Sequence, residues 1–339
     1  MKNTIFGLFA LFFLLACNAT KSPNTSTYKI TNRIALNGDG FWDYLTVDEA
    51  TQRLFVSHGT EVQIVYLKTG KLVATIPDTK GVHGIALAPD LDYGFISCGR
   101  DTSVTVFSLS SMTTTRKIKV TGANPDAILY DGFSKRVYTF NHNGKNATVI
   151  DGVKHKVVST IELGGEPEFA VTDGQGMIFV NLEDKSEIAV IDAKTMKVVQ
   201  NWPVSPGKEP TGLAFDVKNS RLFSVCGNKK MVVLDSKTGK VVQTLPIGQG
   251  VDGVVFDPGM QQIFSSNGEG TMTVIEEKTP DKYRVLATVP TQKGARTIAL
   301  NSKTHCLYLP TAEREPAVGD ERPKVKAGTF VVLEIGAPK

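Results

Sequence analysis

The strongest constraint on the fold is a repeat that runs through almost the whole chain. Each copy carries a polar turn residue after a short apolar run, and the seven positions are Asp48, Asp90, Asp131, Asp173, Asp216, Asp257 and Ser302. By subtraction, their successive spacings are 42, 41, 42, 43, 41 and 45 residues. A nearly fixed period in this range is typical of a propeller, a solenoid or an array.

The contents of one repeat select among these architectures. Short β-type runs at Ala147–Ile150, Val157–Leu163, Phe169–Val171 and Met177–Val180 are separated by turns. Four β-rich segments per period, with no helical pattern between them, favour the propeller. The sequence therefore predicts an all-β fold, a seven-bladed β-propeller with four-stranded antiparallel blades.

The two ends of the repeat region complement each other. Residues Tyr28–Leu36 read like the fourth strand of a blade, although no blade precedes them. The last copy ends at Ile335 and lacks a fourth strand of its own. We therefore predict that the N-terminal strand closes blade seven, which leaves the ring without an open edge. The propeller domain would then span residues 28–339.

The sequence motifs of the repeat resemble those of a known family. Val-Ile-Asp or Val-Leu-Asp at Val149, Val190 and Val233 is followed by Lys-Val-Val, and Gly165-Glu166-Pro167 precedes the next strand. These motifs resemble the YVTN-repeat, YncE-like β-propellers over roughly residues 28–335. The resemblance implies the propeller fold and, because such proteins look mostly like binding modules, a binding role.

The first 27 residues are predicted to direct the chain to the cell envelope. Lys2 precedes an apolar run from Ile5 to Leu15, which is short for a membrane span. The run ends in Leu-Leu-Ala-Cys17, which resembles a bacterial lipobox. We expect a lipoprotein signal peptide at 1–16 and a lipidated Cys17 with a polar tether at 17–27. The alternative is an ordinary signal peptide with a chance cysteine.

The residue after the lipobox bears on the location. Asn18 is not the aspartate associated with retention in the inner membrane, so we expect an outer-membrane lipoprotein that faces the periplasm. A formal charge of +4 is too small to imply a polyanionic partner, and the lysines are scattered over strand turns. We therefore do not expect nucleic acid binding, and we expect a monomer.

Local catalytic and metal motifs are absent from the sequence. There is no Cys-Xaa-Xaa-Cys pair, no His-Xaa-Xaa-Xaa-His pair, no Gly-Xaa-Ser-Xaa-Gly elbow and no P-loop. Cys98, Cys226 and Cys306 read as buried small residues without a disulfide.

The repeat itself offers a candidate site. The position just before the first strand of each blade should face one mouth of the central channel, and in all seven copies it is polar. We call these positions the ring: Asp43, His83, Asp126, Glu168, Thr211, Asp252 and Arg296. Its four acids and one arginine sum to −3 with histidine neutral, a charge that should attract cations and raise carboxyl pKa values. The long segment 312–328 should lie above the ring and supply Arg314 and Arg322.

Three interpretations of the ring remain open. Its side chains could simply bind loop backbone and channel water. They could bind a small ligand or a protein partner, as a binding or scaffold module. As an alternative, a lactonase-like hydrolase or a lyase could use them. In that enzyme, Asp43, Asp126, Glu168 and Asp252 would hold a divalent cation, or His83 would be a general base. A divalent cation is thus the one cofactor that the ring suggests.

Overall fold

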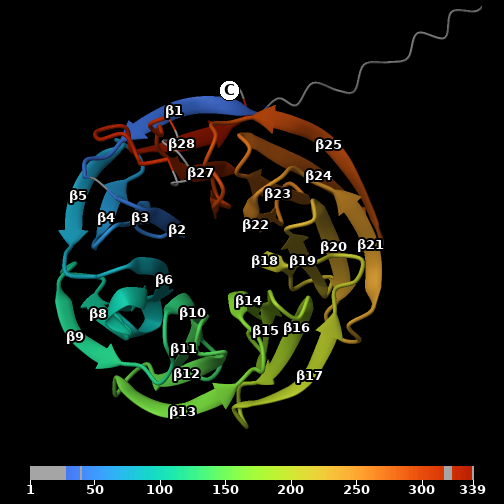
Figure 1. The fold of residues 1–339 in the computed structure, drawn as a ribbon, viewed down its shortest axis with the longest axis horizontal. Helices are drawn as coiled ribbons and strands as arrows, with labels where there is room; N and C mark the ends of the chain where they lie inside the picture. Colours follow the sequence, from blue (N-terminus) through green and yellow to red (C-terminus); the bar gives the residue numbers. More distant parts are fainter. Residues whose placement is uncertain (1–27, 39, 317–322, 338–339) are drawn as a thin grey trace, which may run out of the picture.

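Seven four-stranded antiparallel sheets form a closed ring around a central channel (Figure 1). The computed structural model describes residues 28–38, 40–316 and 323–337. The innermost strands are β2 (Trp42–Asp48), β6 (Val82–Ala88), β10 (Pro125–Asp131), β14 (Pro167–Thr172), β18 (Pro210–Asp216), β22 (Val251–Asp257) and β26 (Ala299–Asn301). The second strands are β3 (Arg53–His58), β7 (Tyr93–Cys98), β11 (Arg136–Asn141), β15 (Met177–Leu182), β19 (Arg221–Cys226), β23 (Gln262–Asn267) and β27 (Cys306–Thr311).

The two outer positions complete each blade. The third strands are β4 (Glu61–Tyr66), β8 (Ser103–Ser108), β12 (Asn146–Asp151), β16 (Glu187–Asp192), β20 (Lys230–Asp235), β24 (Thr271–Thr279) and β28 (Val331–Gly336). The outermost strands are β5 (Lys71–Ile76), β9 (Thr114–Lys119), β13 (Lys156–Glu162), β17 (Lys197–Pro203), β21 (Val241–Pro246), β25 (Lys282–Pro290) and β1 (Lys29–Ala35). The described residues also contain two single-turn 3₁₀ helices, Pro89–Leu91 and Gly99–Asp101. The seven-bladed propeller predicted from the repeat is confirmed.

Blade seven is built from both ends of the chain, as predicted. Strand β1 pairs antiparallel with β28, with Ala35 opposite Val331 and Lys29 opposite Gly336. Just before β1, the hydroxyl of Tyr28 donates a 2.7 Å hydrogen bond to Gln262 in blade six. The N-terminal strand therefore joins its own blade and also contacts the neighbouring one.

The repeated turn residue caps the link between the first two strands of a blade. Asp48, Asp131 and Asp257 each accept a hydrogen bond of 2.9–3.0 Å from a backbone N–H two or three residues later. Such a side-chain bond stabilises a turn, which explains why the repeat keeps aspartate at this place.

The core lies between neighbouring blades. Between blades three and four, for example, Tyr138, Phe140 and Val149 pack against Ile178 and Val180. Burial of this kind supplies most of the stabilisation of a fold, at roughly 25 cal/mol per Å² of apolar surface. Each blade interface repeats the arrangement, so the ring is held together round its whole circumference.

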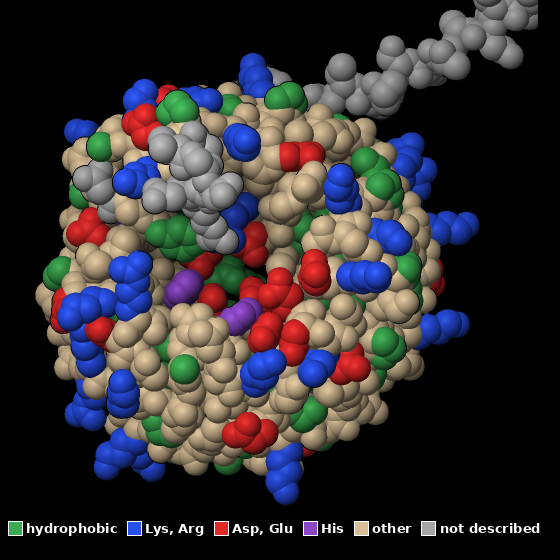
Figure 2. Space-filling view, viewed as in Figure 1, with side chains coloured by type: hydrophobic (Ala, Val, Ile, Leu, Met, Phe, Trp, Pro, Cys, Tyr) green, Lys and Arg blue, Asp and Glu red, His purple; other side chains and the backbone are tan. Residues whose placement is uncertain are grey.

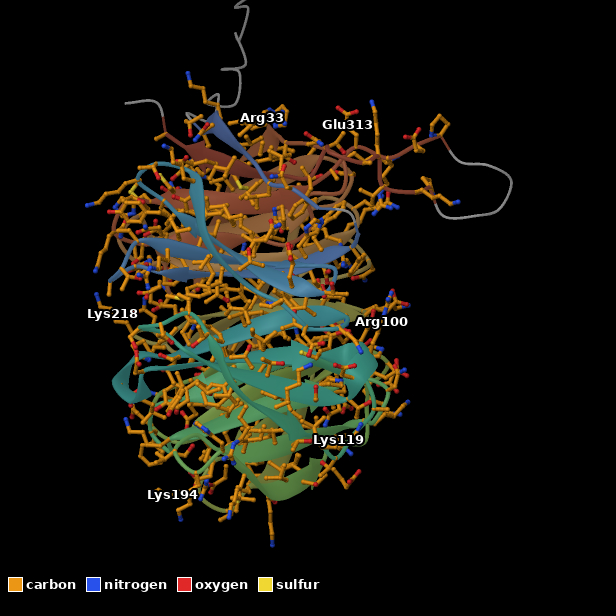
Figure 3. The ribbon with its side chains drawn as sticks, turned by 90° about the vertical axis from the view of Figure 1, so that its left-hand side faces the viewer. Arg33, Arg100, Lys119, Lys194, Lys218 and Glu313 are labelled. Carbon is orange, nitrogen blue, oxygen red and sulfur yellow. The ribbon has the colours of Figure 1, made fainter. Side chains whose placement is uncertain are left out.

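The turns lie on two opposite faces of the disc. Figure 3 shows Arg100 and Glu313, which lie between second and third strands, projecting from one face, and Lys218, which lies between first and second strands, on the other. The connections into the innermost strands open on the face of Arg100 and Glu313. No helix among the described residues is long and apolar enough to cross a membrane.

The cysteines follow the prediction with one exception. Cys98 and Cys226 are buried free thiols. Cys306 is only half-buried, because it is the first residue of β27 and follows an exposed turn. Cys17 and the predicted signal peptide and tether lie outside the described residues.

Candidate functional site

The ring residues face the same mouth of the channel, but their position in the strands differs from the prediction. Asp43, His83, Asp126, Glu168, Thr211 and Asp252 are the second residues of innermost strands rather than the residues before them. In each of these strands the pairing register shifts across this residue. A bulge of this kind redirects a side chain. It also breaks the alternating pattern, which is why the sequence placed the strand starts too late.

Hydroxyl groups on the second strands fix the backbone at the mouth. The backbone N–H of Asp43 donates to Ser57 Oγ at 3.0 Å, and that of Gly84 donates to Ser97 Oγ at 2.8 Å. Ser97 Oγ in turn donates to the carbonyl of Asp126 in the next blade, and Ser266 Oγ donates to the carbonyl of Arg296. The ring is thus held by contacts that cross from blade to blade.

A cavity of about 420 Å³ lies at this mouth. Figure 2 shows acidic and histidine side chains gathered round the central opening, with many lysines and arginines at the outer edge. All seven ring residues line the cavity, together with Phe41, Tyr44 and Glu183. Tyr44 also lines a second cavity of about 280 Å³ deeper in the channel, and its ring centroid lies 5.4 Å from that of Phe169. Tyr44 therefore separates the polar mouth from a mostly apolar channel.

One part of the mouth is a continuous series of ion pairs, which we call the ion-paired chain: Asp252, Arg296, Asp43, His83 and Asp126. Arg296 pairs with Asp252 and lies 3.4 Å from Asp43 Oδ1. His83 Nδ1 lies 2.6 Å from Asp43 Oδ2 and 3.5 Å from Asp126 Oδ1. The ring's own cations are therefore already engaged with three of its four acids.

The remaining acid belongs to a second group, which we call the histidine cluster: His142, Glu168 and Glu183. His142 Nδ1 lies 2.9 Å from Glu168 Oε1, and one donor atom from each of the three residues lies within 4.8 Å of the others. His142 Nε2 is 4.0 Å from Glu166 Oε2. Only Glu168 of this cluster was predicted from the sequence.

The repeat does contain a signal for the other two residues. His142 and Glu183 each follow the last residue of a second strand, in blades three and four. In the other blades the equivalent position is small: Gly59, Gly99, Gly227, Gly268 and Ala312. At Gly99, for instance, a Cβ would come within 2.6 Å of Asn124 Oδ1. At this position, blades three and four carry the metal-donor side chains of His142 and Glu183, whereas the other five blades have glycine or alanine.

Burial and crowding shift the pKa values at the mouth. Burial raises the pKa of the Asp126, Glu168 and Asp252 carboxyls to about 7, helped by the charges of neighbouring acids. Burial lowers the pKa of His83, but its hydrogen bond to Asp43 and the Asp126 charge outweigh this and raise it to about 9. The contact with Glu168 raises the pKa of His142 to about 9. Perturbed groups of this kind gather at functional sites.

The remaining predicted residues are placed as follows. Thr211 lines the mouth and donates from Oγ1 to the carbonyl of Val251 at 3.3 Å. Arg314 is exposed, and its guanidinium carbon lies 5.6 Å from the centre of the Trp42 ring, outside the lining of the mouth cavity. Arg322 lies outside the described residues.

Comparison with known proteins identifies the fold. A solved structure titled Kuenenia stuttgartiensis Hydrazine Synthase superposes with a TM-score of 0.70 over 81% of this chain and 94% of that chain, at 18% sequence identity. This likeness shows a shared β-propeller. No protein-family model matches the sequence, and no curated protein matches it. Membership of the YVTN-repeat family therefore stays a prediction.

Proposed function

We propose that this protein is a binding module of the cell envelope that takes a small, positively charged ligand in the mouth of its propeller. The observation that carries the proposal is the surplus of acid there. Five carboxylates line the mouth, against Arg296 and the two ion-paired histidines. With both histidines protonated, five negative and three positive charges leave −2 once all five carboxyls are ionised. A bound cation favours that state, because the pKa of three of these carboxyls is about 7. A cationic ligand would offset the burial and the repulsion between neighbouring acids that together raise the pKa of Asp126 and Asp252.

The shape of the mouth supports a small ligand. A volume of about 420 Å³ lies within the usual range of small-molecule pockets. Tyr44 closes the floor, and burial together with the surrounding acids raises its pKa well above the ordinary tyrosine value. Its hydroxyl therefore stays neutral and can accept a hydrogen bond from an ammonium or guanidinium group. A protein partner would need a surface that reaches into this recess.

The lyase-like alternative has less support from the geometry. A general base should be unprotonated at the working pH. The pKa of about 9 keeps His83 protonated at neutral pH, and Asp43 and Asp126 both face its Nδ1. The imidazole is therefore better suited to the ion-paired chain than to proton abstraction.

A lipid on Cys17 would hold the module to the outer membrane, facing the periplasm.

A diamine tests the proposal. Putrescine should bind the purified protein in isothermal titration calorimetry, and 1-butanol, which is neutral, should not. Asp126→Asn with Asp252→Asn should weaken putrescine binding by at least about tenfold, which corresponds to ~1.4 kcal/mol. The matched control is Glu162→Gln with Asp281→Asn, which changes net charge equally but lies on an exposed outer strand and a rim turn. Equal weakening in both double variants, or no putrescine binding, would contradict the proposal.

A further inference from the structure

The histidine cluster differs chemically from the rest of the mouth. Among the described residues, no lysine or arginine forms an ion pair with Glu168 or Glu183, and the Glu183 carboxylate accepts no hydrogen bond. The cluster therefore places an imidazole and two carboxylates together without an internal permanent cation.

We propose that His142, Glu168 and Glu183 bind one divalent transition-metal cation, for which Zn²⁺ is the test case. The inference rests on the proposed function, since it names the class of cation for one side of the same mouth. Mixed imidazole and carboxylate donors suit Zn²⁺ and its neighbours better than Mg²⁺, which prefers oxygen ligands alone.

The donor spacing fits such an ion. With Zn–N and Zn–O bonds of about 2.0–2.2 Å, two ligands of one ion lie roughly 3–4 Å apart. His142 Nδ1 and Glu168 Oε1 already stand at 2.9 Å, and the third donor lies within 4.8 Å of both. A side-chain movement of less than about 1 Å would bring Glu183 to bonding distance. The open cavity leaves room for water or a ligand group at the remaining positions.

The surroundings of His142 supply a second, independent indication. A metal-binding histidine usually directs its other ring nitrogen at a carboxylate, which orients the ring. Here Nδ1 faces the cluster and Nε2 faces Glu166 at 4.0 Å. Glu166 is itself held by Lys145, whose Nζ lies 3.2 Å from Oε1. The backbone N–H of Glu166 also donates to Asp184 Oδ1 at 2.7 Å. The outer carboxylate is thus fixed in place.

The other group of possible donors in the mouth serves as a built-in comparison. Asp43, His83 and Asp126 also bring donor atoms within 4.8 Å of one another. However, Arg296 already contacts Asp43, and His83 Nδ1 is hydrogen-bonded to that carboxylate. Nε2 of His83 faces the backbone at Gly99, where a Cβ would lie only 2.9 Å away, and not a carboxylate. Arg296 and His83 thus already supply the positive charge that a metal ion would bring to these carboxylates.

Zinc titration of the purified protein separates the two groups. Equilibrium dialysis should find one tightly bound Zn²⁺ per chain that an equal concentration of Mg²⁺ does not displace. His142→Gln and Glu183→Gln should each weaken Zn²⁺ binding at least about tenfold. The matched control His83→Gln should change it less than about threefold. Melting temperatures near the wild-type value would show that the variants are folded, and Glu183→Gln is nearly isosteric at a half-exposed position.

Each outcome decides between the hypotheses. No saturable Zn²⁺ binding, or binding that survives Glu183→Gln, overturns the metal site. Binding that is lost in His83→Gln but kept in His142→Gln also overturns it. Because the putrescine test depends on Asp126 and Asp252, which lie outside the histidine cluster, diamine binding without zinc binding would reject only the metal site. Zinc binding without diamine binding would reject the wider ligand proposal and leave the metal site standing.

Discussion

His83 is the residue whose charge most clearly links the mouth to stability. The groups that face it are Asp43, Asp126 and, more distantly, Arg296. Its pKa is about 9 in the fold and 6.5 in the ordinary reference state. The stabilisation is therefore fully present below pH 6.5 and is lost as the pH rises through 9. The carboxyls of Asp126, Glu168 and Asp252 have pKa values raised to about 7. They therefore change the pH dependence of stability mainly at a pH below about 7.

Urea unfolding at pH 7 and at about pH 9.5 measures the effect of His83. The wild-type free energy of unfolding should fall across this interval, and His83→Gln should reduce the fall by on the order of 1–3 kcal/mol. A residual slope should remain in the variant, because the pKa of His142 is also raised to about 9. An identical pH dependence in wild type and His83→Gln would show that the imidazole does not hold its proton in the fold.

The sequence could predict the ring but only part of the site at the residue scale. A single repeat position defines all seven ring residues, so counting along the repeat was enough to find them. His142 and Glu183 occupy a position that is glycine or alanine in the other blades. Whether these two side chains form a site depends on which loops approach each other across the mouth. No local pattern encodes the 2.9 Å contact between His142 and Glu168.

At the scale of elements, each outermost strand has a buried residue at or next to its C-terminal end, and β25 has Tyr283 as a second buried residue. The residues at or next to the C-terminal end are Ile34, Ile76, Ile118, Ile161, Trp202, Leu245 and Val289. Ile34 of β1 is 4% exposed and Ile118 of β9 is 7% exposed. The N-terminal strand thus has the same anchor as a strand inside the chain. Its membership of blade seven could be predicted because residues 28–36 read like a fourth strand and the last copy of the repeat lacks one.

Matched substitutions test whether β1 is a full member of its blade. Ile34→Ala and Ile118→Ala should each lower the free energy of unfolding by about 2–4 kcal/mol, since each leaves a cavity of similar size. Lys29→Ala, at an exposed position of β1, should change it by less than about 0.5 kcal/mol. A much smaller cost for Ile34→Ala than for Ile118→Ala in thermal or urea unfolding would mean that β1 frays and that the ring closes without it.

At the scale of the whole molecule, the closure of blade seven places the start of β1 on the face opposite the mouth. Ala35 pairs with Val331, where β28 begins at the face of the mouth, whereas Lys29 pairs with Gly336 at the other end of β28. The chain therefore enters the propeller at Tyr28, on the face opposite the ring. A protein tethered through Cys17 would then be attached on the side opposite its mouth, which leaves the mouth free to face away from the membrane.

Anchoring and orientation can be tested together. If Cys17 carries the lipid, Cys17→Ser should leave the protein unlipidated, and either unprocessed or in the soluble fraction. Lipidated wild-type protein in phospholipid vesicles should bind putrescine with a Kd within about twofold of the Cys17→Ser protein, since a difference of ~0.4 kcal/mol or less is expected when the membrane does not cover the mouth. Wild-type protein recovered as a soluble species without lipid mass would reject the anchor. Vesicle-bound protein with a strongly weakened affinity would instead place the mouth against the bilayer, which the pairing of β1 with β28 argues against.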